Sequence, residues 1–189
     1  MGELLIRDAT EDDAAVIAAI YAHHVLNGTA TYDIDPPSVA ETLAKLRHIA
    51  AAGWPFVVAE DGGEVAGYAY ATQFRDRAAY RFACENSIYV APDRMRRGVG
   101  KALLGSLIDR SAACGFRTMV AVVGGAEPAS IALHAALGFE EVGRLKRVGF
   151  KFGRWLDSVY LQRTLEQSRV PRSESSPPSR PAPRLRPRA

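Results

Sequence analysis

The chain has 189 residues, of which 48% are hydrophobic and 24% charged, a profile typical of one soluble globular domain with a sizeable core. No apolar run is long enough to span a bilayer, and two cysteines, Cys84 and Cys114, are too few for a disulfide framework or a zinc site. The first eight residues contain two acids and no apolar signal core, so we expect a cytoplasmic protein that binds neither a membrane nor a metal.

The first part of the chain predicts one strand and two helices. Thr10 and Ser38 are helix-capping residue types, and each precedes a stretch with apolar residues at helical spacing. Asn27-Gly28 and the following proline pair interrupt the chain between these stretches. The expected elements are a strand over 4–6, a helix over 14–26 and a helix from Ser38 to Ala52.

The middle of the chain predicts a hairpin followed by alternating strands and helices. Asp61-Gly62-Gly63 is typical of a hairpin turn, and a loop rich in arginine and aromatic residues covers 74–81. This order of elements predicts an α/β fold with a mixed central β-sheet and helices on both faces. The expected elements are strands over 56–59 and 65–70, a strand ending at Val90, a helix from Gly98 to Gly115, a strand over 118–123, a helix from Pro128 to Gly138, and strands near 141–143 and 158–161.

The net charge of +3 is unevenly distributed along the chain. From Ser168 onward six arginines face a single acid, so this segment carries +5 and the rest carries −2. Residues 166–189 are otherwise rich in proline and serine, and we expect a disordered basic tail there. The predicted domain covers residues 1–165, and its charge gives no reason to expect a nucleic acid partner.

The segment from Met95 to Lys101 predicts an anion-binding turn. It follows Pro92, which ends a strand, and its glycines open a helix where bare backbone N–H groups and the helix dipole attract a pyrophosphate. A Walker A loop requires glycine at Met95 and a hydroxyl residue at Ala102, and a Rossmann loop requires a small residue at Leu103. Both common nucleotide loops are therefore excluded. The competing interpretation is an ordinary helix start with solvated arginines.

Two segments of this chain resemble the acetyl-CoA site of the GNAT superfamily of N-acetyltransferases: Arg96 to Leu104, and Ser130-x-x-Leu133-His134-x-x-x-Gly138-Phe139. The resemblance covers about residues 4 to 164 and implies the GNAT fold. It extends to the phosphinothricin and methionine sulfoximine acetyltransferase branch. The stretches similar to that branch are Thr29–Tyr32, Gly63–Tyr70, Gly115-Phe116, Val120–Gly124 and Gly149–Asp157.

The resemblance implies that acetyl-CoA is the co-substrate. Backbone groups around Ile88, Tyr89 and Val90 would hold its pantetheine arm. Two positions depart from the family, with Met95 where Gln or Arg is usual and Glu127 where Asn or Asp is usual. The other implied cofactor-binding residues are Arg96, Arg97, Gly98, Val99, Gly100 and Lys101 for the pyrophosphate, together with His134.

Acetyl transfer to an amine needs a base that accepts a proton from the substrate ammonium. Glu85 matches the proposed base of the branch and lies in a mostly apolar strand, where its pKa would rise. The competing interpretation is a carboxylate paired with a nearby arginine. His134 is implied either to protonate the leaving thiolate or to contact CoA, with a structural role as the alternative. We expect Cys84 to be buried and unreactive, so the amine attacks the thioester directly.

The loop before Glu85 contains candidate substrate-binding residues. Arginine forks bind carboxylates bidentately, and in the branch this loop contributes to substrate binding. We therefore expect Arg75, Arg77 and Tyr80 to bind an amino-acid substrate, with solvated side chains as the alternative. Tyr32 is either a wall of the same pocket or a core aromatic residue. The branch also implies a homodimer.

The predicted activity is transfer of an acetyl group from acetyl-CoA to the α-amine of a small amino-acid-like substrate of the phosphinothricin, methionine sulfoximine or sulfone type. One alternative is acetylation of a protein N-terminus or lysine, which would need an open groove. Another is a non-catalytic acyl-CoA-binding module that uses the basic tail.

Overall fold

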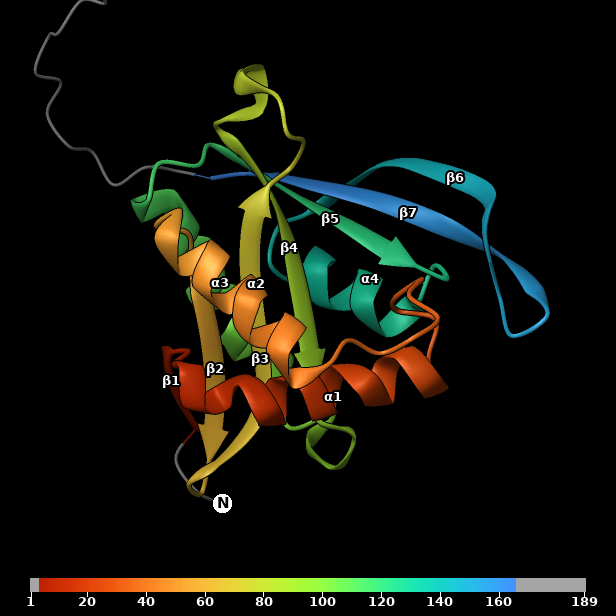
Figure 1. Ribbon diagram of the computed structural model, residues 1–189. Coiled ribbons are helices and arrows are strands. Elements are labelled where there is room, and N and C mark those ends of the chain that lie inside the picture. The colour runs from red at the N-terminus through yellow and green to blue at the C-terminus, as the bar shows by residue number, and fades with distance from the viewer. Residues whose placement is uncertain (1–3, 166–189) are drawn as a thin grey trace, which may run out of the picture.

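The computed structural model describes residues 4–165, which form a central sheet with helices on both faces (Figure 1). This confirms the predicted α/β architecture. The strands are β1 (Leu4–Asp8), β2 (Phe56–Asp61), β3 (Glu64–Gln73), β4 (Ala83–Val90), β5 (Thr118–Gly124), β6 (Glu140–Lys151) and β7 (Arg154–Thr164). The helices are α1 (Ala14–Asn27), α2 (Val39–Ala51), α3 (Val99–Ala113) and α4 (Pro128–Ala135), with 3-10 turns η1 (Glu11–Asp13), η2 (Ala78–Tyr80) and η3 (Pro92–Arg94).

The seven strands lie in the order β1-β2-β3-β4-β5-β7-β6. Strands β4 and β5 are parallel to each other, and the other neighbouring pairs in the described chain are antiparallel. Helices α1 and α2 pack on one face, and α3 and α4 pack on the other. The parallel pair in the middle of the sheet is the feature that positions the site.

Side chains of the central strands alternate between two cores. On β3, Ala69 and Ala71 belong to the core under α3, whereas Tyr68 and Tyr70 belong to the core under α1 and α2. On β4, Ile88 faces α3 and Tyr89 faces α1. Because side chains of a strand alternate, Glu85 and Ser87 project to the same face as Tyr89. The acidic candidate therefore lies on the α1 and α2 side of the sheet.

The predicted helix starts are largely confirmed. The Ser38 hydroxyl accepts a hydrogen bond from the Glu41 N–H at 3.2 Å, and the Glu41 carboxylate accepts one from the Ser38 N–H at 2.8 Å, a capping box. At the first helix, the Asp13 carboxylate accepts from the Thr10 N–H, but the chain makes η1 before α1 begins. Helix α4 ends at Ala135 rather than at Gly138.

The last hairpin is much longer than the sequence predicts. Strands β6 and β7 have 12 and 11 residues instead of two short strands, and they extend well beyond the rest of the sheet (Figure 1). Glycines and charged residues obscure the alternation in β6, and its register shifts twice, between Glu141 and Gly143 and between Leu145 and Gly149. Pairing along β7 holds the strand together despite these shifts.

The remaining predictions concern membrane-spanning helices, metal sites and the C-terminal tail. No helix within residues 4–165 has both the length and the apolar character that a membrane span requires. The same residues contain no group of three histidine, cysteine or acidic side chains arranged to hold a metal ion. The predicted tail, residues 166–189, lies outside the described residues.

Candidate active site

Strands β4 and β5 diverge part of the way along their length. Their pairing ends with Asn86 opposite Ala121, whereas β4 continues to Val90 and β5 to Gly124. Strand β5 remains paired with β7 throughout. The edge of β4 that faces the gap therefore has backbone groups that an extended ligand can pair with.

A cavity of about 880 Å³ follows this divergence. Its volume lies in the range of cofactor and ligand sites. It extends from the turn before α3, across β4 and β5, to the segment 30–32 and the β6–β7 hairpin. Of the predicted site residues, those in its lining are Tyr32, Glu85, Ile88, Tyr89, Val90, Arg96, Gly98, Gly100, Lys101, Glu127 and His134.

The turn before α3 presents backbone rather than side chains. Gly98 is the N-cap residue with φ 84°, a left-handed conformation that favours glycine, and no side chain of the described residues caps the helix. A Cβ at Gly100 would lie 3.3 Å from Leu133, so glycine also lets α3 approach α4 closely. The first N–H groups of α3 therefore point into the cavity without a competing side-chain acceptor.

The basic residues of this turn have different positions. Arg96 and Lys101 line the cavity, whereas Arg97 lies on the surface outside the lining. Val99 is 2% exposed and packs in the core under α3, so only its backbone can contribute to a ligand site. Arg94 is held by ion pairs to Asp61, Glu64 and Asp93.

One backbone group of β4 already has a protein partner. His24 on α1 contacts the Val90 carbonyl through Nε2 at 2.9 Å. Burial lowers the pKa of His24, so the neutral ring donates this hydrogen bond at neutral pH. Of the backbone positions predicted to hold a pantetheine arm, Val90 thus has its carbonyl engaged, and His24 has a structural contact.

Glu85 lies at the point where the strands diverge. Its side chain is 32% exposed and lines the cavity, and its nearest cation is Arg75, with Nη1 3.8 Å from Oε2. Burial raises the pKa of Glu85, and the charge of Arg75 opposes this shift. A carboxylate with a raised pKa at a divergence of two strands is suited to accept a proton from a bound ligand.

The loop between β3 and β4 brings one of its three candidates toward this carboxylate. Arg75 stacks on the Phe74 ring, with its guanidinium carbon 4.1 Å from the ring centroid. Arg77 and Tyr80 also lie on the exposed part of the loop, and none of the three, Arg75 included, belongs to the cavity lining. Gln73 holds the loop through hydrogen bonds to the Arg75 and Arg77 carbonyls at 2.6 and 3.2 Å.

Tyr32 joins the segment after α1 to the distant hairpin. Its hydroxyl donates to the Asp157 carbonyl at 2.7 Å and accepts from the Gly125 N–H at 3.1 Å. A Cβ at Gly149 would lie 2.7 Å from its ring, so the ring packs directly on the β6 backbone. Buried Lys151 supports the same segment by donating to the Thr31 carbonyl at 2.9 Å. Tyr32 is thus a cavity wall whose hydroxyl has a structural role.

His134 is 4% exposed and lies between two partners. Its Nδ1 lies 2.8 Å from the Ser130 carbonyl, and its Nε2 lies 3.1 Å from the side-chain amide oxygen of Asn86. Burial lowers the pKa of His134, which favours the neutral ring. Both partners are oxygen acceptors, so the single N–H of a neutral ring donates to one of them, the Ser130 carbonyl or the Asn86 amide oxygen.

Several lining residues escape sequence reasoning. Asn86 pairs with a histidine 48 positions away, and no local pattern indicates that contact. Leu145 and Val148 reach the cavity from the irregular part of β6, and Tyr160 reaches it from β7. For these lining residues the sequence offered one signal: side chains alternate along β4, so Ser87 is expected on the same face of the sheet as Glu85.

Comparison with known proteins identifies the relatives of this arrangement. Residues 6–160 match the family model described as an acetyltransferase (GNAT) domain. The phosphinothricin N-acetyltransferase of Alcaligenes faecalis is 49% identical over 161 residues, covering 85% of this chain and 82% of that protein. The L-methionine sulfoximine/L-methionine sulfone acetyltransferase of Pseudomonas paraeruginosa is 42% identical, covering 87% of this chain and 96% of that protein.

A solved structure is similarly close. The phosphinothricin acetyltransferase of Sinorhizobium meliloti, solved in complex with AcCoA, superposes with a TM-score of 0.86 at 51% identity. The match covers 93% of this chain and 96% of that one.

Proposed function

This chain belongs to the GNAT acetyltransferase family, and from that premise we propose that it acetylates the α-amine of a small amino-acid-like substrate. It is an acetyl-CoA-dependent N-acetyltransferase. The proposed substrates are of the phosphinothricin, methionine sulfoximine or methionine sulfone type, because relatives at 49% and 42% identity carry those activities in their names.

The cavity suits acetyl-CoA in both size and chemistry. We assign its pyrophosphate to the uncapped N–H groups that begin at Gly98, with Arg96 and Lys101 adding positive charge. The open edge of β4 around Ile88 suits an extended pantetheine arm. Bound there, acetyl-CoA supplies a thioester whose carbonyl carbon a neutral amine attacks, forming a C–N bond as the C–S bond breaks and the thiolate leaves.

Glu85 is the residue that we assign as general base. The observation that carries the proposal is its partly buried carboxylate at the divergence of β4 and β5, inside the cavity. It accepts the proton that the substrate ammonium must lose before the nitrogen lone pair can attack. Cys84 is fully buried and burial raises its pKa to about 12, which supports direct transfer rather than an acetylated cysteine.

For His134 we propose a positioning role. In either tautomer the single N–H of the neutral ring faces a protein acceptor, the Ser130 carbonyl or the Asn86 amide oxygen, and is not directed at a leaving thiolate. Its contact with Asn86 instead orients β4 at the divergence, beside the assigned base. Contact with CoA, rather than acid catalysis, is the interpretation of His134 that this geometry favours.

We assign the substrate carboxylate to Arg75. Its guanidinium is close to Glu85 without the bidentate contact of a closed ion pair, since the distance is 3.8 Å. An α-amino acid carries its carboxylate one carbon from its amine, so an arginine beside the base is well placed to bind it. All three loop candidates lie outside the cavity lining, and Arg77 and Tyr80 are left out of this assignment because, among the cations of the described residues, only Arg75 lies within 4.0 Å of the Glu85 carboxylate.

The test is a thiol-release assay with acetyl-CoA and a panel containing phosphinothricin, methionine sulfoximine and methionine sulfone. We expect turnover by the wild type and its loss in Glu85→Gln, with acetyl-CoA binding retained in calorimetry. Asp109→Asn serves as the matched control, because Asp109 is an exposed carboxylate on α3 outside the cavity.

Two outcomes would contradict the proposal in different ways. Wild-type turnover with undiminished activity in Glu85→Gln would remove Glu85 as base but leave the substrate type standing. Binding of acetyl-CoA without turnover of any amino acid would remove the substrate type, and a peptide panel would then test acetylation of a protein amine.

We also propose a homodimer. The β6–β7 hairpin exposes large apolar side chains, and β6 is the last strand of the sheet. Size-exclusion chromatography with light scattering tests this, with Trp155→Arg expected to shift the protein to the monomer. Unchanged mass in that variant would contradict the assignment of this surface. The exposed residues are Val142, Leu145, Val148, Phe150, Phe152 and Trp155.

A cytoplasmic location is the remaining proposal. Cys84 and Cys114 are both free thiols, which a reducing compartment preserves. Fractionation of cells that produce the tagged protein tests it, and recovery in a membrane or secreted fraction would contradict it.

A further inference from the structure

Arg94, the last residue of η3, binds three carboxylates at once. Its Nη1 donates to Asp61 at 3.1 Å, its Nη2 to Glu64 at 2.6 Å and its Nε to Asp93 at 3.2 Å. Asp61 ends β2 and Glu64 begins β3, and the turn between these strands lies at the same end of the sheet as the turn before α3 (Figure 1). The contacts of Arg94 with Asp61 and Glu64 therefore tie the two turns together, and we call them the hairpin tether.

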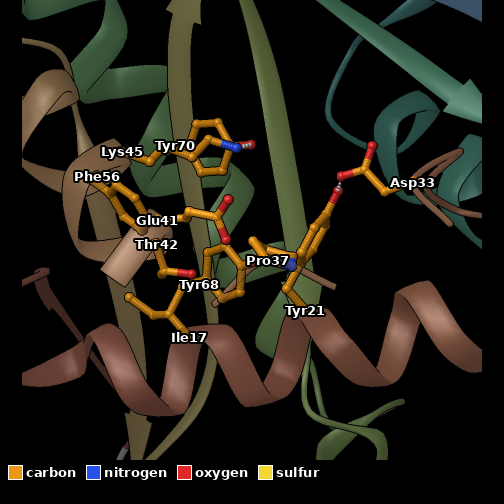
Figure 2. Close-up of a pocket in the computed structure, with 10 residues that line it drawn as sticks. All are labelled: Ile17, Tyr21, Asp33, Pro37, Glu41, Thr42, Lys45, Phe56, Tyr68 and Tyr70. Carbon is orange, nitrogen blue, oxygen red and sulfur yellow. Dashed lines mark hydrogen bonds between the residues drawn. The ribbon is translucent and has the colours of Figure 1, made fainter. Parts of the chain in front are cut away.

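The β2–β3 hairpin is a firm support for this tether. Its strands are paired along their length up to the turn. On the face under α1 and α2, the rings of Phe56, Tyr68 and Tyr70 pack together with centroids 5.1–6.4 Å apart, beside a second cavity of about 200 Å³ (Figure 2). Lys45 of α2 covers the Tyr70 ring, with Nζ 4.4 Å from its centroid. A carboxylate at the end of this hairpin is therefore fixed relative to the sheet.

The three ion pairs of Arg94 differ in their exposure to solvent. The side chains of Arg94 and Asp61 are 21% and 18% exposed, whereas those of Glu64 and Asp93 are 74% and 72% exposed. Exposed ion pairs contribute little because water and salt screen them, and sheltered pairs are screened less. The contact between Arg94 and Asp61 is therefore the main link, and Glu64 adds to it from the exposed side.

The surrounding charge distinguishes Arg94 from the other cations of the turn. Arg96 and Lys101 line the large cavity, and within residues 4–165 neither has a carboxylate within 4.0 Å. Arg94 also lines the cavity, but three carboxylates surround its single positive charge. Carboxylates close to a site for a polyanion oppose binding of that anion. The arrangement therefore suits a link between backbone segments better than the attraction of a phosphate.

The backbone between Arg94 and α3 is strained at one residue. Arg96 has φ 61°, a left-handed conformation that a residue other than glycine rarely adopts. Such a conformation persists where the surrounding structure holds it, and it is common at ligand sites. Arg94 is fixed two residues before it, and the N-cap Gly98 starts α3 two residues after it. The hairpin tether therefore limits the conformations of the segment that leads to the first N–H groups of α3.

We propose that Arg94 is a positioning residue for acetyl-CoA: the hairpin tether holds the turn before α3 in the conformation whose N–H groups bind the pyrophosphate. The inference rests on the proposed place of the pyrophosphate at Gly98 and not on the amino-acid substrate. When the binding-competent conformation is only part of the population, the apparent Kd rises in inverse proportion to that part. Loss of the tether therefore weakens acetyl-CoA binding without any change at the reacting atoms.

The test is isothermal titration calorimetry of the full chain with acetyl-CoA, in the absence of an amino acid. Asp61→Asn is expected to raise the Kd about fivefold, which corresponds to a fall of the competent fraction to about one-fifth of its wild-type value. The sign of this change is decisive. Asp61→Asn removes a negative charge close to a polyanion, so an effect of charge alone would lower the Kd instead.

Three further variants separate the tether from other effects. Glu64→Gln changes an exposed side chain that cannot disturb packing, and it is expected to raise the Kd about twofold. Glu60→Gln is the matched control, because it removes the same charge from the preceding residue of β2, whose partner is Arg7 on β1; its Kd should equal that of the wild type or fall slightly. In an Arg94→Met background the tether is already absent, so Asp61→Asn should no longer raise the Kd.

Steady-state kinetics distinguish positioning of the cofactor from general damage to the enzyme. At saturating acetyl-CoA, the kcat of Asp61→Asn should stay within about twofold of the wild type, with the loss confined to the KM for acetyl-CoA. A fall in kcat with an unchanged Kd would overturn the positioning role, since the substitution would then act on the chemical step.

The calorimetric outcomes also separate this inference from the proposed function. A Kd that is unchanged or lower in both Asp61→Asn and Glu64→Gln would overturn the tether. A rise of the same size in Glu60→Gln would also overturn it, because the loss would then belong to the hairpin as a whole. So would a full effect of Asp61→Asn in the Arg94→Met background, because Arg94 would then not be the link. Failure of the wild type to acetylate any amino acid would overturn the proposed substrate but not the tether, because calorimetry needs no acceptor.

Discussion

Replacing Gly149 by alanine should destabilise the protein through Tyr32, a residue 117 positions away in the chain. A Cβ at Gly149 would lie 2.7 Å from Cε2 and 2.9 Å from Cζ of the Tyr32 ring. Carbon atoms in contact prefer about 3.5–4.0 Å, so the ring or the β6 backbone must retreat by roughly 1 Å. The substitution therefore probes how tightly the segment after α1 is packed on the hairpin.

The retreat is costly because three hydrogen bonds hold the hydroxyl of Tyr32 in place. It donates to Asp157 at 2.7 Å and accepts from the Gly125 N–H and the Ser158 hydroxyl, each at 3.1 Å. Overpacking typically costs about 1–3 kcal/mol, and each weakened hydrogen bond adds about 1 kcal/mol. We expect the free energy of unfolding to fall by about 2–4 kcal/mol, which lowers Tm by roughly 5–15 °C in a domain of this size.

Urea unfolding followed by tryptophan fluorescence measures this loss. Gly143→Ala is the matched control, since it lies on the same strand and an added Cβ would meet no heavy atom of the described residues within 4 Å. Its expected change is within about 0.5 kcal/mol.

A double-mutant cycle identifies the cause. In a Tyr32→Ala background the ring is absent, so Gly149→Ala should cost far less than in the wild type. The reasoning is refuted if Gly149→Ala is as mild as Gly143→Ala, or if its full cost persists without the tyrosine ring.

Three further substitutions test the turn, the base and the hairpin contact. Gly98→Ala should lower the free energy of unfolding by about 1–2 kcal/mol in urea, because φ is 84° there while the added Cβ meets no atom of the described residues, and an unchanged midpoint would contradict this. The value of kcat/KM should rise with pH as Glu85 loses its proton. The charge of Arg75 opposes the raised pKa of Glu85, so Arg75→Met should move this acid limb to higher pH. An acid limb that stays at the same pH would count against Glu85 as the base. Lys151→Met leaves the Thr31 carbonyl unpaired and should cost about 1–3 kcal/mol in thermal unfolding, whereas a stability equal to the wild type would show that the contact is dispensable.

The parts of the site that sequence could predict depend on local backbone. Gly98 marks the turn before α3 because its left-handed conformation is a property of the local backbone. The alternation within β4 likewise placed Glu85 on a definite face. The loop candidates fared differently: all three lie outside the cavity lining, and only Arg75 reaches Glu85, because a loop's path depends on contacts such as those of Gln73.

The long hairpin shows a second limit of sequence reasoning. Register in β6 depends on its partner β7, and two shifts interrupt the pattern that a single strand would display. As a consequence, no pattern in the sequence indicated that Leu145 and Val148 would line the cavity. The pairing of Asn86 with His134 likewise joins a strand to a helix that only folding brings together.

By itself, the sequence determined the order of elements, the mixed sheet, the glycine turn before α3 and the family to which the resemblance pointed. These features rest on periodicity and on backbone conformations that neighbouring residues dictate. Tertiary structure alone decided where β4 separates from β5, and that separation creates the cavity. It also decided that Lys45 would face Tyr68 and Tyr70 across a pocket, because a helix and a strand far apart in the chain acquire a common surface only when both pack on the same core.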